Sequence, residues 1–407
     1  MRAETLELCC CPECYADLAL EPGYESDGCE ITRGSLRCDA CGERYAIDRG
    51  LVFLTRDNHE WRLLRKEAQE WGKYADWDTI AEEYFDQLPY FAPSGAKQDN
   101  GFDADTYWGI EALMTAWNLD VLRDLLAGVE RPAIWDIGVQ SAWTSKLLAK
   151  HLSGARVIAS DIVDQDNFGL GVPKKVFFDR HDIFFERFIS DVHWRNLKRE
   201  SMDAVYAAMT LHHFEYLQQG LDNIASVLKP DGVFCAAEPI VDLSCDKYTN
   251  SYETDNWVKH GIREMSYYFT DYYQFLANAG FKDIRMYPYF LLDERAKPDG
   301  YNRDLMLPYY PMPQRYVAEC RGPRKALFDM MASFEFREFT TPFYVFIYAS
   351  KTRSLEGLDR VFLMRDVRAR RLVQAARYEF MHHPGRAEAI GAEGDGSRDG
   401  QTPCAVR

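Results

Sequence analysis

The sequence lacks the features of a membrane protein or a nucleic-acid-binding protein. It has no apolar run near the roughly 20 residues that a membrane-spanning helix needs, and no segment typical of a secretory signal peptide. Positive charge is scarce, because 48 Lys and Arg face 64 Asp and Glu, for a formal net charge of -16. Affinity for phosphate backbones comes mainly from Lys and Arg. We therefore expect a soluble, cytoplasmic protein with no membrane association and no general nucleic-acid binding.

Cysteine is scarce along most of the chain and concentrated at its start. Of the eleven cysteines, only Cys235, Cys245, Cys320 and Cys404 lie beyond residue 41. A disulfide framework would be spread along the chain and would imply an oxidising compartment. Close clustering indicates a metal site instead.

Two CxxC pairs, Cys11 with Cys14 and Cys38 with Cys41, account for four of the seven cysteines in this cluster, and Cys9, Cys10 and Cys29 are surplus. Each pair places two thiolates of one turn on the same side, and two such turns complete a four-thiolate site for structural Zn²⁺. Four protein ligands leave no open position, which argues against catalytic zinc. A redox function is the weaker alternative, because no thioredoxin-like strand and helix surround either pair.

The remaining chain is long and apolar enough for a sizeable core. It has 407 residues, of which 47% are hydrophobic. From 131 to about 290, short apolar strands alternate with helices. The strands are expected over 132–138, 156–163, 174–182, 202–211, 232–240 and 281–289. This alternation predicts an α/β fold with a doubly wound, Rossmann-like parallel sheet, preceded by a small N-terminal zinc-binding domain.

The turn after the first strand reads like a nucleotide-binding loop that has lost glycines. Asp136 and Gly138 are present, but Gln140 and Ala142 stand where further glycines belong. Ligands of such sheets bind beyond the carboxyl ends of the strands. Asp161 ends the second strand, 25 residues after Asp136, where an acid binds a ribose diol.

The motifs that follow the loop along the chain indicate a protein family. Residues 210–214 read TLHHF, and NIASVLKPDGVF follows. This series resembles class I S-adenosylmethionine-dependent methyltransferases over about 131–290, with a late strand at 341–350. The resemblance implies S-adenosyl-L-methionine as cofactor, with Asp136 and Gly138 at its methionine end, Asp161 at its ribose and Asp182 at its adenine. The full set of expected cofactor-binding residues is Asp136, Gly138, Gln140, Asp161, Ile162, Asp182, Met209 and Thr210.

A nicotinamide dehydrogenase is the competing interpretation of a glycine-poor nucleotide fold. Pyrophosphate binding depends more on a glycine-rich helix N-terminus. Because S-adenosylmethionine carries no phosphate, Gln140 and Ala142 are less damaging to it. The Pro-Asp-Gly turn at 230–232 and the late strand also favour the methyltransferase.

The N-terminal module carries a second resemblance. CPECYADL, then GSLRCDACGERYAIDRGLVFL, resembles the zinc ribbon of tRNA-methyltransferase activator subunits. In that family the module is an accessory or activating platform without chemistry of its own. The resemblance implies a possible protein partner that docks through the ribbon.

Three residues are candidates for catalysis. Methyl transfer to a hydroxyl or amine needs the acceptor's proton removed, and a base with a pKa near 7 suits that step. His212 and His213 lie at the end of the fourth strand, and Glu238 at the end of the fifth. The alternative for the histidines is a structural turn with one imidazole bonded to the backbone.

These observations predict five segments: a zinc ribbon at 1–56, a helical cap at 57–130, a methyltransferase domain at 131–352 with an insertion at 291–338, a C-terminal helix at 353–385, and a disordered tail at 386–407. Dense aromatic residues at 84–91, 248–273 and 301–316 favour a small-molecule or glycan-type acceptor, methylated at oxygen or nitrogen. The alternatives are an inactive methyltransferase-like scaffold that docks through its ribbon, and an RNA or translation-factor methyltransferase.

Overall fold

The computed structural model describes residues 1–28, 30–74, 115, 118–166, 168–240, 261–263, 265, 267, 269–289 and 343–358. Most of the expected helical cap at 57–130, the insertion at 291–338, most of the C-terminal helix and the whole tail at 386–407 lie outside these residues. None of the helices within the described ranges has the length and apolar character that crossing a bilayer would require.

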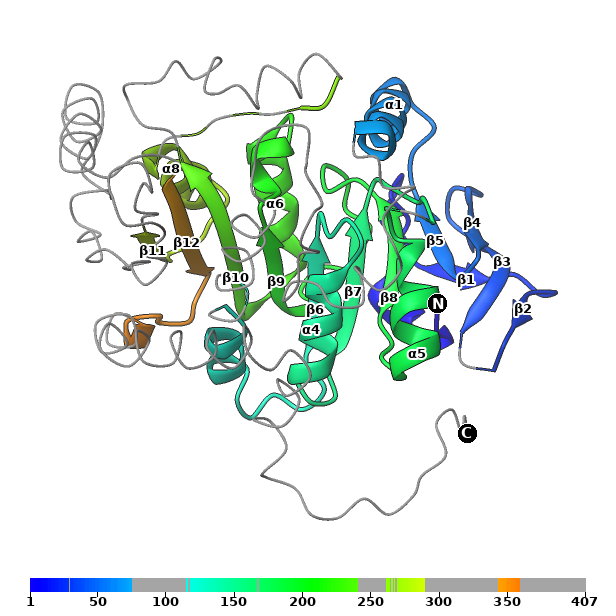
Figure 1. Ribbon diagram of the computed structural model, residues 1–407, viewed down its shortest axis with the longest axis horizontal. Helices are drawn as coiled ribbons and strands as arrows, with labels where there is room; N and C mark the ends of the chain where they lie inside the picture. Colours follow the sequence, from blue (N-terminus) through cyan, green and yellow to red (C-terminus); the bar gives the residue numbers. More distant parts are fainter. Residues whose placement is uncertain are drawn as a thin grey trace, which may run out of the picture.

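One mixed sheet runs through the described part of the chain (Figure 1). Its central strands follow the order β8-β7-β6-β9-β10-β12-β11, with β8, β7, β6, β9 and β10 parallel and β12 antiparallel to both neighbours. This is the doubly wound order with one antiparallel strand inserted near its edge. The predicted fold class is therefore confirmed. The bounds are β6 (Ala133–Ile137), β7 (Arg156–Asp161), β8 (Glu186–Ser190), β9 (Met202–Ala208), β10 (Leu228–Ile240), β11 (Asp283–Tyr289) and β12 (Phe343–Ser350).

The helices cover the two faces of this sheet, since alternate strand residues point to opposite sides. On one face, Tyr206 packs with Leu147 of α4 (Trp143–His151) and Phe177 of the helical turn η3 (Lys174–Phe178). On the other face, its neighbour Val205 packs with Leu221 of α6 (Leu217–Val227) and with α8 (Phe269–Asn278). The sheet is thus buried on both sides, as a parallel sheet requires.

The N-terminal strands extend the same sheet. Strands β1 (Leu18–Leu20), β3 (Ile31–Cys38), β4 (Arg44–Asp48) and β5 (Leu51–Leu54) are antiparallel to one another, and β2 (Glu25–Ser26) pairs with β3. Strand β5 then pairs in parallel with β8, from Leu51 opposite Arg187 to Leu54 opposite Ser190. The cysteine-rich segment and the α/β segment therefore share one sheet, and Leu36 and Tyr45 belong to the same apolar cluster as Trp135.

A buried ion pair accompanies this junction. Arg187 of β8 lies 3.2 Å from both carboxylate oxygens of Glu30, and their side chains are only 1% and 2% exposed. Arg187 also donates to the carbonyl oxygen of Arg49 at 2.9 Å. Burial lowers the pKa of Arg187, and Glu30 opposes that shift. Next to it, Glu186 accepts hydrogen bonds from Thr5 Oγ1 and the backbone N–H of Arg2.

The expectation of a third strand over 174–182 is wrong. Residues 174–178 form η3, 179–181 form the helical turn α5, and the third strand is β8. A short apolar run such as KKVFF has no period that separates strand from helix. The true strand was hidden by Glu186 and Arg187, whose partners lie in the N-terminal segment more than 150 residues away.

We predict that Arg187→Met lowers the free energy of unfolding by about 3 kcal/mol, because it leaves a buried carboxylate without its guanidinium partner. The double variant Glu30→Gln, Arg187→Met should recover much of that loss. Arg37→Met serves as the control, since Arg37 pairs with Asp39 at an exposed position and should cost less than about 1 kcal/mol. Urea denaturation measures all three. Equal losses for Arg187→Met and Arg37→Met would contradict the prediction.

Candidate functional site

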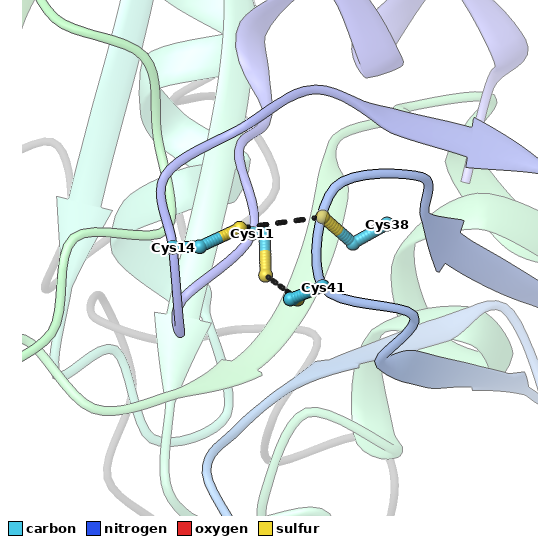
Figure 2. Close-up of side chains that lie close together, drawn as sticks. All are labelled: Cys11, Cys14, Cys38 and Cys41. Atoms are coloured by element: carbon cyan, nitrogen blue, oxygen red, sulfur yellow. Dashed lines mark hydrogen bonds between the residues drawn. The ribbon is translucent and has the colours of Figure 1, made fainter.

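The four predicted cysteine ligands lie together. The Sγ atoms of Cys11, Cys14, Cys38 and Cys41 are all within 4.8 Å of one another. Figure 2 shows the two turns facing each other, with Cys14 and Cys38 Sγ 3.4 Å apart and Cys11 and Cys41 Sγ 3.6 Å apart. Two thiolates bound to a tetrahedral Zn²⁺ at about 2.3 Å would be about 3.8 Å apart. The donor set and its spacing therefore fit a structural zinc ion.

The surroundings of the cluster support the same four ligands and exclude Cys9 and Cys10 as further metal ligands. Tyr45 Oη lies 3.0 Å from Cys11 Sγ, where a hydroxyl can donate to a thiolate. Cys10 instead points into the junction, with its Sγ 3.2 Å from the carbonyl oxygen of Leu197, and Cys9 Sγ lies 3.2 Å from the carbonyl oxygen of Thr5. Burial raises the pKa of both thiols, to about 11 for Cys10, so they remain protonated packing residues.

The loop after β6 keeps a glycine-type backbone without its glycines. The φ angles of Gly138, Gln140 and Ala142 are 67°, 48° and 60°, all in the left-handed region. A non-glycine residue in this region costs roughly 1–2 kcal/mol. Tertiary contacts must hold the loop in this conformation, because neither Gln140 nor Ala142 favours it.

Asp161 provides one of these contacts. Its Oδ2 accepts from the backbone N–H of Gln140 at 2.7 Å, and its Oδ1 accepts from that of Val163 at 2.9 Å. Burial raises the pKa of Asp161, and these N–H groups oppose the shift. The side chain is buried at the carboxyl end of β7, and Ile162 follows it at a half-buried position.

Asp136 is bound on the helix side. Its Oδ2 accepts from Thr144 Oγ1 at 2.7 Å and from Ser145 Oγ at 2.6 Å, both in the first turn of α4. Burial raises the pKa of Asp136 to about 7. This carboxylate therefore joins the carboxyl end of β6 to the helix that follows it.

The placement of Asp182 corrects the sequence prediction. Asp182 is exposed, has a φ of 53°, and comes before β8 rather than after it, at the edge opposite Asp161. The acid at the carboxyl end of β8 is Asp191, which is 5% exposed. Its Oδ1 is 2.6 Å from His193 Nδ1. The error follows from the misplaced third strand, and the SD pair after ERFI was the available signal.

Thr210 and Met209 follow β9 and lie against the same loop. Met209 has a φ of 55°, and its N–H donates to the carbonyl oxygen of Ala237 at 2.8 Å. A Cβ added to Gly138 would lie 1.8 Å from Thr210 Oγ1 and 2.6 Å from Thr210 Cβ. Gly138 is therefore required twice, by its φ angle and by the contact with Thr210.

Glu238 holds the turn that carries the two histidines. Its Oε1 accepts from the N–H groups of Thr210 and Leu211, each at 2.9 Å, and its Oε2 is 2.7 Å from His212 Nδ1. Burial raises the pKa of Glu238 to about 7 and lowers that of His212 to about 3. Glu238 therefore fixes the backbone of this buried turn and the orientation of the His212 ring.

With Glu238 ionised, the partners of both imidazoles assign the ring proton to Nδ1. His212 Nδ1 faces a carboxylate and His213 Nδ1 faces the carbonyl oxygen of Arg263, which can only accept. Each Nε2 then has a lone pair, which is the form that a general base needs. Burial also lowers the pKa of His213 to about 3, so both rings are neutral near pH 7.

The helix α1 (His59–Tyr74) lies beyond the carboxyl ends of the parallel strands (Figure 1), and sequence reasoning did not assign residues of it to the site. The indole of Trp71 stacks on Phe168 with centroids 6.2 Å apart and meets His213 edge-on at 5.4 Å. Glu67 is buried and accepts from the N–H of Arg263 at 3.0 Å. The first part of the expected cap thus contacts the loops that follow β7 and β9.

A comparison with protein families supports this geometry. A model of the family described as "Methyltransferase domain" matches residues 135–236, about a quarter of the chain, from within β6 to within β10. Over this segment the chain is similar to that family. Among curated proteins, none matches the sequence.

Three solved structures illustrate the likeness of fold. Phosphoethanolamine N-methyltransferase 2 of Haemonchus contortus is 16% identical, with a TM-score of 0.40, and covers 58% of this chain and 53% of its own. The arsenic(III) S-adenosylmethionine methyltransferase of Chlamydomonas reinhardtii is 16% identical (TM-score 0.36; 60% and 74% covered). A chain from the complex between the Haloferax volcanii Trm112 methyltransferase activator and a methyltransferase is 16% identical (TM-score 0.34; 61% and 96% covered). The chain spans about half the length of the Haemonchus enzyme.

We predict that Gly138→Ala destabilises the α/β segment by at least about 2 kcal/mol more than Gly154→Ala does. Both glycines have a positive φ, so both variants have the left-handed penalty. A Cβ on Gly154 meets only Arg131 at 3.7 Å, whereas one on Gly138 collides with Thr210. Equal losses in chemical denaturation would show that the contact with Thr210 is unimportant.

We also predict that Glu238→Gln reverses the tautomer of His212 while the turn persists. The amide oxygen can still accept from Thr210 and Leu211, but its NH₂ group must donate to His212 Nδ1 and so moves the ring proton to Nε2. Ring ¹⁵N chemical shifts of labelled histidines measure this change. His193, which pairs with Asp191, is the internal control. An unchanged His212 spectrum would refute the assigned pairing.

Proposed function

We propose that the protein is an S-adenosylmethionine-dependent methyltransferase that acts on a small-molecule or saccharide-type acceptor, at oxygen or nitrogen. The observation that carries the proposal is a row of buried carboxylates along the carboxyl edge of the sheet. Strands β8, β7, β6 and β10 each end at or next to one of them: Asp191, Asp161, Asp136 and Glu238.

The charge of this row favours a cationic ligand. Burial raises the pKa values of Asp136, Asp161 and Glu238, which means that their ionised forms are short of solvation. A sulfonium would stabilise the ionised carboxylates, whereas the pyrophosphate of a dinucleotide would repel them. The row therefore supports a methyltransferase over a nicotinamide dehydrogenase.

The individual residues also suit the cofactor. The Asp161 carboxylate accepts from the backbone N–H groups of Gln140 and Val163, and the N–H of Ile162 also lowers its pKa. A carboxylate has about four lone-pair sites, so one is left to accept from a ribose hydroxyl. Ile162 adds an apolar surface beside it. We assign the adenine side to Asp191 in place of Asp182, and the methionine end to the backbone at Gly138 and Gln140.

The proton of the acceptor would be taken by a histidine. S-adenosylmethionine supplies an electrophilic methyl group, and the protein must then position an acceptor and remove its proton. His213 is half-buried and His212 is 5% exposed, so we favour His213 as the base and assign Glu238 the positioning of His212. The lowered pKa of His213 keeps its ring unprotonated near pH 7 and makes it a weaker base than an unperturbed imidazole. Trp71 contacts His213 in the same turn, and Thr210 contacts Gly138 in the adjoining loop.

The N-terminal module would be a zinc ribbon of the activator type that is fused to its enzyme. Four convergent thiolates support the zinc assignment, and the parallel pairing of β5 with β8 supports a docking role for the module. We also propose that a separate protein partner binds the outer strands of this module.

A second candidate is a methyltransferase-like scaffold that no longer binds the cofactor. Gln140 and Ala142 favour it, because their side chains occupy loop positions where backbone alone would let a ligand approach most closely. Binding of the cofactor decides between the two candidates.

We predict that titration calorimetry detects S-adenosylmethionine binding and that Asp161→Asn weakens it at least about tenfold. The variant replaces one carboxylate oxygen by an NH₂ group, so it loses a ribose acceptor and one of the backbone N–H bonds that Asp161 accepts. Asp182→Asn is the matched control: it removes an exposed carboxylate at the opposite edge, and asparagine tolerates the positive φ angle there.

Absence of heat with the zinc-loaded wild type would favour the scaffold. Equal affinities for Asp161→Asn and the wild type would refute the ribose assignment. Where binding is found, a search of cell extracts for products heavier by one methylene identifies the acceptor.

A further inference from the structure

Arg56 lies in the short segment between β5 and α1 and connects the four-cysteine site with the carboxyl edge of the sheet, where we propose that the cofactor binds. Its Nε donates to the carbonyl oxygen of Pro12 at 3.0 Å, its Nη2 donates to the same oxygen, and its Nε lies 3.8 Å from Glu13 Oε2. Pro12 and Glu13 are the two residues between the ligands Cys11 and Cys14. The guanidinium therefore holds the backbone of the first metal-binding turn.

The same guanidinium contacts the loop that follows β8. It lies over the ring of Trp194, with Cζ 5.5 Å from the ring centroid. Trp194 is buried, and its N–H donates to the carbonyl oxygen of Asp191 at 3.3 Å. Trp194 also meets Trp61 of α1 at 6.5 Å, edge to face. One side chain thus touches the metal turn and the indole that joins the Asp191 loop to α1.

A second cation on an aromatic ring strengthens the connection. Arg195, the residue after Trp194, lies over the ring of Tyr15, with Cζ 4.2 Å from the centroid. Tyr15 follows the ligand Cys14, and its Oη accepts from Arg56 Nη2 at 3.4 Å. Each guanidinium–aromatic contact is attractive, and more strongly so when it is partly desolvated.

We infer that Arg56 is a positioning residue that couples metal loading of the four-cysteine site to S-adenosylmethionine affinity at the carboxyl edge. The inference rests on the proposed function, which supplies the ligand. It also rests on the contacts above, which connect the metal site with the carboxyl edge. With the metal bound, the turn at Cys11–Cys14 is fixed, and Arg56 and Trp194 hold the Asp191 loop and α1. Without it, the turn relaxes and these contacts loosen. Coupling of this kind is reciprocal, so the cofactor must also slow metal loss.

The test compares Arg56→Met with Arg37→Met. Methionine keeps an apolar stem against Trp194 and removes the guanidinium, while Arg37 lies beside the other metal-binding turn and bonds only to Asp39 among the described residues. Both variants should retain one zinc per chain. In the wild type and in Arg37→Met, chelation of zinc should weaken S-adenosylmethionine binding about tenfold, and the cofactor should slow zinc release. In Arg56→Met, zinc-loaded protein should bind the cofactor as weakly as the chelated wild type.

Hydrogen exchange gives a readout that does not need the cofactor. Zinc-loaded Arg56→Met should exchange faster than zinc-loaded wild type in α1 and in residues 191–197, with no change in β9 or β10. Unchanged exchange there, or the same zinc dependence of cofactor affinity in Arg56→Met and the wild type, overturns the inference. Wild type that binds no cofactor but shows the exchange difference would overturn the proposed function and leave the mechanical link standing.

Discussion

The structure depends on the parallel pairing of β5 with β8. Because the pairing is parallel, the chain leaves β5 at the same edge where β6, β7 and β8 leave the sheet. The helix α1 begins a few residues later and is therefore placed against the loops of that edge. An antiparallel junction would have sent it to the opposite edge. The cysteine-rich module thus determines where α1 begins, and the buried pair of Glu30 and Arg187 joins the module to β8 beside this pairing.

The same edge explains how a loop poor in glycine can keep a glycine-type backbone. Gln140 and Ala142 resist their φ angles, but the N–H of Gln140 is held by Asp161 and Gly138 is packed under Thr210. Thr210 is in turn held by Glu238. The cost of a left-handed residue is of the same order as one charge-assisted hydrogen bond, so a few such contacts are enough to hold the loop. The surrounding carboxylates therefore hold the conformation of the loop, and Gly138 is the loop residue that favours it.

Much of the fold could be read from local patterns. The spacing of Cys11, Cys14, Cys38 and Cys41 predicted a cluster that the structure brings together, and apolar runs predicted β6, β7, β9, β10, β11 and β12. The third strand could not be found in this way. Its two charged residues are buried only because the N-terminal module supplies their partners, and that knowledge requires the tertiary fold. The misplaced Asp182 and the missed Asp191 follow from this single error, while Glu67 and Trp71 were missed because no local motif marks a cap.

The carboxylates of the edge show why burial of charge is tolerated here. Asp136, Asp161, Asp191 and Glu238 each accept from hydroxyl, imidazole or backbone donors of an adjoining loop. A buried carboxylate with such donors fixes the groups that provide them, so each acid orders one loop. Burial still raises the pKa values of Asp136, Asp161 and Glu238, which means that the donors do not fully replace water. A cation that enters among these acids would supply the missing stabilisation. The edge is therefore an ordered scaffold for four loops, and its buried acids are the electrostatic basis of the proposed binding of a sulfonium.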